Sequence, residues 1–184
     1  MKTLSTLALI GMLFFACKLC SFTGANNNKP EPTSTPTPQP MLYAGDLIKQ
    51  QLGHFSLIKH STKEEMKKTA SGFGVQLLSQ ANDAGVGQYR ADNGKTVILS
   101  VYSFSSPQSA SSLIDQLERE GRDSKSKTAI IKSTQTANGK RIEALGLVGR
   151  KLQAMVVWNN GYWFFMTMGD SMVEATALAD AVGY

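Results

Sequence analysis

The feature that most constrains the fold is a set of three strand-turn-strand patterns between residues 86 and 168. The paired segments are rich in β-branched and aromatic residues, and each pair is joined by a short turn that contains Asn-Gly. The pairs are Val86–Ala91 with Thr96–Phe104, Ala129–Thr134 with Arg141–Leu147, and Leu152–Trp158 with Tyr162–Met168. The turns are Asp92-Asn93-Gly94, Asn138-Gly139 and Asn159-Asn160-Gly161. Because Asn-Gly favours tight hairpin turns, these patterns predict three hairpins in an antiparallel sheet.

Two helices are indicated by capping residues and apolar periodicity. The first begins at Ser106, which is followed by proline, and ends at Gly121. The second begins near Ser171, which forms the pattern of a capping box with Glu174, and ends at Gly183. Apolar residues share one face of each predicted helix. They are Ala110, Leu113, Ile114 and Leu117 in the first, and Met172, Ala175, Leu178, Ala179 and Val182 in the second.

These elements predict an α+β fold with helices packed on one antiparallel sheet. We expect about six to seven strands and two to three helices in a two-layer sandwich, with the helices mainly on one face. A third helix is predicted over Tyr43–Leu52, with Leu47, Ile48 and Leu52 on one face. The pattern within residues 61–84 is unclear, because a helix capped by Thr62 would be interrupted by glycines.

The N-terminal segment has the pattern of an export signal. Lys2 precedes an apolar run from Leu4 to Ala16 that is too short to span a bilayer comfortably. The run ends in Phe14-Phe15-Ala16-Cys17, which resembles the lipobox of bacterial lipoproteins, although leucine is commoner where Phe14 stands. The resemblance implies a signal peptide over residues 1–16 and acyl chains, such as palmitate, on Cys17. Cleavage by ordinary signal peptidase and a buried N-terminal helix are the alternatives.

A proline-rich segment follows the lipobox-like motif. Five of the six prolines of the chain fall between Pro30 and Pro40. Closely spaced prolines favour extended polyproline II structure and bury little apolar surface. Residues 17–40 are therefore predicted to be a disordered tether, whose last twenty residues span up to ~60 Å. Residues 41–184 are long enough for a single globular domain.

The charge of the predicted domain is modest. The chain has 19 basic and 14 acidic residues, and only Lys2, Lys18, Lys29 and Glu31 precede residue 41, which leaves 16 and 13. Recognition of nucleic acid needs a concentrated basic face. The basic groups form only small clusters, namely Lys59 to Lys68, Lys140-Arg141 and Arg150-Lys151. These clusters are interpreted as solvated faces, with contact to anionic lipid headgroups as the alternative.

The last predicted hairpin is apolar on both of its faces. Side chains alternate across a strand, so Phe164 and Phe165 point to opposite sides, and both sides of this segment are rich in apolar groups. A sheet with one face in water does not have this pattern. Three interpretations are open: helices or the 61–84 segment cover both faces, one face lines an apolar ligand groove, or one face meets a partner or a second copy. The possible ligand or partner face is formed by Tyr162, Phe164, Met166, Met168, Met155 and Val157.

The sequence contains no recognised set of catalytic or cofactor-binding residues. It lacks a G-x-S-x-G motif and a phosphate-binding G-x-x-x-x-G-K-[ST] motif. His54 and His60 are ~20 Å apart along an extended strand, too far to share a metal. The pair Met166 and Met168 is interpreted as core packing rather than as ligands of Cu(I). We therefore name no catalytic residues and expect no metal and no cofactor.

Together, these patterns favour a bacterial cell-envelope lipoprotein, anchored in a membrane, whose domain lies outside the cytoplasm. Its predicted function is non-catalytic binding or assembly at the membrane surface, with an unknown protein or a small apolar ligand as partner and no nucleic acid. One alternative is a carrier of a small apolar or lipidic ligand. The other is an envelope hydrolase whose site is formed by residues distant in the sequence.

Overall fold

The structure is a computed structural model that describes residues 43–70, 73–123, 127–148 and 150–183. The predicted signal peptide (1–16), Cys17 and the tether (17–40) lie outside the described residues. The described residues all belong to one compact unit, Pro40–Tyr184, which contains two hydrophobic clusters. This unit therefore has a hydrophobic core of its own around which it can fold without the first 39 residues.

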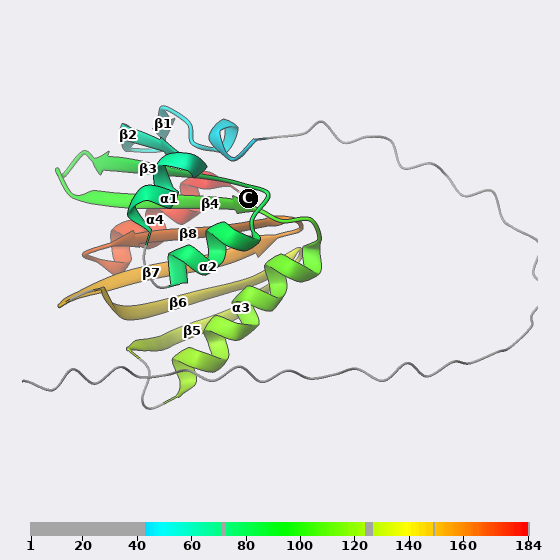
Figure 1. Cartoon of the computed structure of the whole chain (residues 1–184). Coiled ribbons are helices and arrows are strands. Elements are labelled where there is room, and N and C mark those ends of the chain that lie inside the picture. Colours follow the sequence, from blue (N-terminus) through cyan, green and yellow to red (C-terminus); the bar gives the residue numbers. More distant parts are fainter. Residues whose placement is uncertain (1–42, 71–72, 124–126, 149, 184) are drawn as a thin grey trace, which may run out of the picture. The chain divides into compact units, whose positions relative to one another are not determined.

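The centre of the fold is a single antiparallel sheet of eight strands (Figure 1). Its spatial order is β1-β2-β3-β4-β8-β7-β6-β5. The strands are β1 (Gln51–Leu52), β2 (Phe55–Thr62), β3 (Asp83–Ala91), β4 (Thr96–Ser103), β5 (Thr128–Thr136), β6 (Gly139–Val148), β7 (Lys151–Asn160) and β8 (Trp163–Gly169). The helices are the short 3-10 helix η1 (Ala44–Leu47), α1 (Lys63–Thr69), α2 (Phe73–Gln80), α3 (Pro107–Arg122) and α4 (Met172–Val182).

The three predicted hairpins are confirmed as β3–β4, β5–β6 and β7–β8. Gly94 and Gly161 have positive φ angles of 81° and 56°, as their turns require. Gly139 has a different role: a Cβ atom there would collide with the backbone and the side chain of Asn159. Two further hairpins, β1–β2 and β6–β7, and the antiparallel pairs β2–β3 and β4–β8 complete the order of the strands.

Helices cover both faces of the sheet, so the predicted two-layer sandwich is wrong. We name the two sides by their helices: α4 and η1 pack on the α4 face, while α1, α2 and α3 lie on the α3 face (Figure 1). The core of the α4 face includes Tyr89, Phe165 and Leu178, and the core of the α3 face includes Phe164 and Ile114. Two covered faces explain why the central strands are apolar on both sides.

The counts of elements also differ from the prediction, although the α+β class and the antiparallel sheet are confirmed. The described residues form eight strands and four α-helices, against six to seven and two to three expected. The predicted helix over Tyr43–Leu52 is wrong beyond η1, because Gln51–Leu52 pairs with β2. The unclear segment within 61–84 contains α1 and α2, and α1 begins with a capping box between Thr62 and Glu65.

The capping of the two predicted long helices follows the sequence only in part. Ser106 caps α3 by accepting a hydrogen bond from the Ser109 backbone N–H (3.1 Å), and Ser171 caps α4 through the Val173 N–H (3.2 Å). The predicted capping box of α4 is wrong, since the Glu174 carboxylate binds Lys95 and Asn93 instead of the Ser171 backbone. Among the described residues, no helix is long and apolar enough to cross a membrane.

Candidate functional site

The six residues of the predicted ligand or partner face lie along the α3 face of β7 and β8, and helices cover part of them. Phe164 and Val157 are 0% and 3% exposed and belong to the core. Met155 and Met166 are half-buried against the same cluster, and Met168 is also half-buried. Tyr162 is 48% exposed in the turn before β8. The buried pair is thus structural, and only the rest of this face is accessible to a ligand.

The open end of this face forms a shallow hollow of about 400 Å³. Ile98 and Met168 pair across β4 and β8 and contribute its apolar surface. The rest of the wall is polar and includes Lys95 and Lys151. Lys95 is bound to Glu174, and Lys151 lies 2.7 Å from Asp170. The two lysines therefore add little net charge to the hollow, whose apolar surface is confined to the part around Ile98 and Met168.

A second cavity, of about 200 Å³, lies at the opposite end of β7, near the β5–β6 turn. Its walls come from the turn, from the start of β6 and from the end of β7. They comprise Thr136, Ala137, Asn138, Arg141, Trp158, Asn159 and Asn160. Arg141 and Trp158 lie directly opposite each other in the β6–β7 register, so their side chains share the α4 face. We call this site the Arg141–Trp158 cavity.

Trp158 is held rigidly in the wall of this cavity. Its ring stacks on Phe165 with centroids 4.9 Å apart and planes 9° apart. The residue is only 5% exposed and belongs to the core of the α4 face. Among the described residues, no acceptor lies within hydrogen-bonding distance of its buried Nε1–H group. An indole N–H that is buried without an acceptor is destabilising, so this group is a candidate for a further hydrogen bond.

Arg141 presents a second N–H group of the same kind. Its Nη1 lies 2.6 Å from Asp180 Oδ1 at the end of α4. Its Nε lies 4.0 Å from Glu143 Oε1, which is too long for a hydrogen bond, and this atom is buried without an acceptor in the described part of the chain. Because Asp180 and Glu143 balance its charge, Arg141 adds no net positive charge to the wall of the cavity. This chemistry suits an uncharged ligand with oxygen acceptors better than a free anion.

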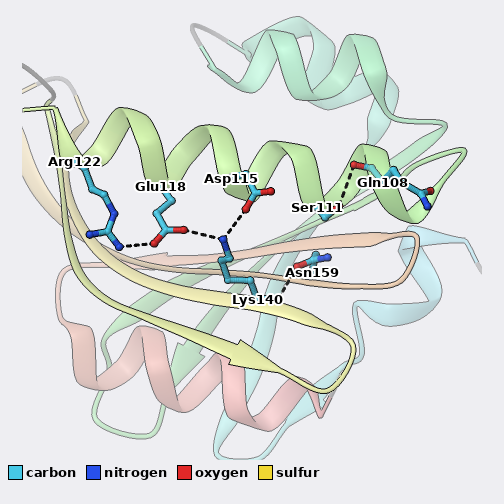
Figure 2. A network of polar contacts seen from close by, with 7 residues as sticks. All are labelled: Gln108, Ser111, Asp115, Glu118, Arg122, Lys140 and Asn159. Atoms are coloured by element: carbon cyan, nitrogen blue, oxygen red, sulfur yellow. Dashed lines mark hydrogen bonds and ion pairs between the residues drawn. The ribbon is translucent and has the colours of Figure 1, made fainter.

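On the α3 face, a network of ion pairs holds the turn that forms one wall of the cavity (Figure 2). Lys140 Nζ lies 2.6 Å from Asp115 Oδ1 and 2.8 Å from Glu118 Oε2, and Arg122 Nη2 lies 2.6 Å from Glu118 Oε1. The Lys140 backbone N–H also donates to Asn159 Oδ1 (2.8 Å). The network therefore fastens α3 to the start of β6 and to the end of β7.

We call the network of Asp115, Glu118, Arg122, Lys140 and Asn159 the clamp, and its electrostatics indicate a structural role. The hydrogen bond from Arg122, with that from Lys140, lowers the pKa of Glu118 to about 2. Hydrogen bonding to Asp115, and then to Glu118, raises the pKa of Lys140. Both groups are thus held in their charged forms near neutral pH. A group that stays ionised in this way is a poor general acid or base.

No arrangement of residues suited to catalysis stands out in the described chain. The Ser111 hydroxyl, beside the clamp, donates to the Gln108 carbonyl oxygen (3.1 Å) and not to a base (Figure 2). The described residues contain no group of three or more His, Cys, Asp or Glu side chains placed to hold a metal ion. Cys17, the predicted lipid attachment residue, lies outside the described residues.

Sequence reasoning missed the Arg141–Trp158 cavity. The sequence placed Arg141 in a small basic cluster and Trp158 in an apolar strand, without relating the two. A signal was present, because Arg141 follows one Asn-Gly turn and Trp158 precedes the next. If the two hairpins are neighbours in antiparallel order, these turns meet at one end of the sheet and the two residues face each other.

Comparisons with known proteins leave the family open. No family model matches the sequence, and no curated protein matches it. Among solved structures, a GTP binding regulator from Thermotoga maritima is similar, with a TM-score of 0.43 and 16% sequence identity. The similarity covers 76% of this chain and 81% of that chain.

Proposed function

We propose that this chain is a bacterial cell-envelope lipoprotein whose domain is a non-catalytic binding module outside the cytoplasm. The lipobox-like sequence before Cys17 supports the lipid anchor, and the proline-rich segment to Pro40 supports a tether between anchor and domain. The paired charges and the lack of a nucleophile beside a base support binding rather than catalysis within the described residues. The ligand site that we propose is the Arg141–Trp158 cavity.

The observation that carries this assignment is that two residues lining one cavity each hold a buried N–H group without a partner among the described residues. Native proteins rarely leave a buried donor without an acceptor, so each exception calls for an explanation, and a bound ligand is one. Trp158 Nε1 and Arg141 Nε come from adjacent strands and from facing positions in the register. A single polar group that accepts from both would be bound more strongly than a group that reaches only one of them.

The surroundings define the chemical class of the ligand. Asp180 and Glu143 disfavour a second anion, while Asn138 and Asn160 supply amide groups at the rim. The volume of about 200 Å³ is below that of typical drug-sized pockets, so one ring or one amide group of a larger molecule fits. We therefore propose that the ligand is an uncharged sugar or amide with carbonyl or hydroxyl oxygens.

The test is an NMR titration of ¹⁵N-labelled residues 40–184 with N-acetylglucosamine, which carries both hydroxyl and amide oxygens. The indole resonances of Trp158 and Trp163 are assigned with a Trp163→Phe variant. We expect a saturable shift of the Trp158 indole resonance, loss of that shift in Arg141→Met, and a weaker response to sodium acetate. A Trp158 resonance that does not respond to the sugar, or that responds equally in Arg141→Met, contradicts the proposed site.

A second candidate function is carriage of a small apolar or lipidic ligand in the hollow beside Ile98 and Met168. The observation that favours it is the size of the hollow, about 400 Å³, next to the half-buried Met155 and Met166. Methionine side chains adapt readily to apolar ligands. Native mass spectrometry of residues 40–184, purified without detergent, tests this function. Bound extra mass that is lost in Met168→Asp would favour carriage, and a bare monomer would count against it.

A further inference from the structure

The β6–β7 hairpin projects beyond both of its neighbouring strands. The outermost pair between β7 and β8 at this end is Ala154 with Gly169, and the outermost pair between β5 and β6 is Thr128 with Gly146. The pairing of β6 with β7 continues further, through Leu147 with Leu152 and Val148 with Lys151. In Figure 1 this hairpin ends at the left edge of the sheet. We call Leu147, Val148, Arg150, Lys151 and Leu152 the hairpin end.

The hairpin end exposes three large apolar side chains. Leu147 is 48% exposed, Val148 is 49% exposed and Leu152 is 56% exposed. Leu147 and Leu152 are cross-strand partners on the α4 face, whereas Val148 points to the other face. Single exposed apolar residues are common, but three at the end of one projecting hairpin form a local apolar surface.

Basic residues are neighbours of these apolar residues in the chain or across the sheet. Arg150 and Lys151 belong to the hairpin end, and both are exposed. Lys127 is also exposed, and its carbonyl oxygen accepts a hydrogen bond from the Leu147 backbone N–H (2.9 Å). One acidic residue, Asp170, forms an ion pair with Lys151 on the surface. Among the described residues named here, three positive charges stand against the one negative charge of Asp170.

We propose that the hairpin end docks on the surface of an anionic lipid bilayer. The apolar tips of Leu147, Val148 and Leu152 would enter the boundary between headgroups and acyl chains. Arg150, Lys151 and Lys127 would lie among the anionic headgroups, where basic residues are favoured. This combination of apolar and basic side chains is the one that interfacial membrane segments use. The inference concerns a second surface and does not depend on the ligand of the Arg141–Trp158 cavity.

The arrangement fits a fluid bilayer better than a folded partner. Apolar side chains lie on both sides of the hairpin end, so a rigid flat partner would bury only one side. A bilayer surrounds an inserted tip and covers both sides. The excess of positive charge matches anionic lipids, and it opposes the approach of a second copy with the same charge.

The experiment is vesicle flotation of unlipidated residues 40–184, so that any binding comes from the domain. Vesicles of pure phosphatidylcholine are compared with vesicles in which about one lipid in three is phosphatidylglycerol. The test variants are Leu147→Ser with Leu152→Ser, and Arg150→Gln with Lys151→Gln. The matched control is Val173→Ser on α4, because Val173 is more exposed (75%) and lies outside the hairpin end. Thermal unfolding of each variant checks that the fold is intact.

We expect flotation with the anionic vesicles and little with the neutral ones. Each basic residue lost should weaken the partition coefficient about fivefold, and the double leucine variant should weaken it by about tenfold or more. Added salt should reduce binding of the wild-type chain more than binding of Arg150→Gln with Lys151→Gln. The Val173→Ser control should bind like the wild-type chain.

Three outcomes would overturn the proposal. The first is that the folded wild-type chain does not float with anionic vesicles. The second is that Val173→Ser weakens binding as much as the leucine variant, which would mean that the contact is not specific to the hairpin end. The third is a wild-type dimer, seen by light scattering, that the leucine variant converts to a monomer while neither chain binds vesicles. That last result would assign the hairpin end to an interface between copies.

Discussion

Lys95 Nζ lies 2.7 Å from Glu174 Oε1, and this ion pair joins the tip of the β3–β4 hairpin to the first turn of α4. Asn93 Nδ2 donates to the same oxygen (3.1 Å). The Glu174 side chain is 9% exposed, so the pair is shielded from solvent on one side. The hydrogen bond from Lys95, with others from the same region, lowers the pKa of Glu174 to about 2. The contact therefore helps to hold α4 on the face that contains Trp158.

The low pKa values of Glu174 and Glu118 predict a loss of stability in acid. Each is about 2 in the folded protein against an ordinary value of 4.5, so the unfolded chain takes up protons first as the pH falls. Their stabilising contribution is complete above the ordinary value and is lost as the pH falls from about 4.5 to 2. Urea unfolding of residues 40–184 at pH 6 and pH 3 should show this loss.

Glu174→Gln separates the contribution of one carboxylate. We expect this variant to lose about 1 kcal/mol of unfolding free energy at pH 6 and to depend less on pH than the wild-type chain. Glu120→Gln is the control, because Glu120 is exposed and bonds to the neutral Gln116. An acid transition of Glu174→Gln that matches the wild-type transition would contradict the role of the ion pair.

Phe164 and Tyr162, both in the predicted ligand face, should respond very differently to truncation. Phe164 is fully buried and packs edge-on against Tyr102 with centroids 5.9 Å apart, whereas Tyr162 is 48% exposed. Phe164→Ala should cost about 3–5 kcal/mol of unfolding free energy, because it leaves a cavity in the core. Tyr162→Ala should cost less than about 1 kcal/mol. Equal losses in urea unfolding would show that the helices do not cover this face as described.

The hairpins and α3 were predictable because their signals are local. Asn-Gly turns and the Ser106 cap act within a few residues, so no knowledge of distant contacts is needed. Helices α1 and α2 have only seven and eight residues, and the glycines near them obscure the pattern. The alternation in β8 indicated that both faces of the strand are apolar, but it could not say whether helices, a ligand or a partner covers each face.

The cavity depends on register, which local sequence does not determine. Arg141 and Trp158 meet because β6 and β7 form a hairpin whose turn, at the far end, lacks an Asn-Gly signal. The Arg141–Asp180 pair joins residues 39 positions apart and depends on how α4 packs. Trp158 Nε1 has no hydrogen-bond acceptor because of how all the surrounding side chains pack, which no local stretch of sequence specifies. Such features appear only when the whole fold is known.

Replacing Lys140, the cation that Asp115 and Glu118 share, should make the β5–β6 turn more mobile. Lys140 is only 24% exposed and lies within 2.8 Å of both Asp115 and Glu118. Lys140→Gln should lower the unfolding free energy by about 1–2 kcal/mol, since two carboxylates would lose their common partner. Amide hydrogen exchange in the turn should become faster. Lys132→Gln on exposed β5 is the control, and equal effects of the two substitutions would contradict the clamp.

The proposed lipid anchor and the proposed docking of the hairpin end should make separable contributions to membrane association. Cys17→Ser removes the thiol that the lipobox-like sequence presents for acylation, so the full chain should move from the membrane fraction to the soluble fraction after a high-salt wash. The wash removes contacts that depend on Arg150 and Lys151, because salt screens them. Cys20→Ser is the matched control and should stay with the membrane, since Cys20 lies three residues beyond the motif. Retention of Cys17→Ser after the wash, or equal release of Cys20→Ser, would refute an anchor at Cys17.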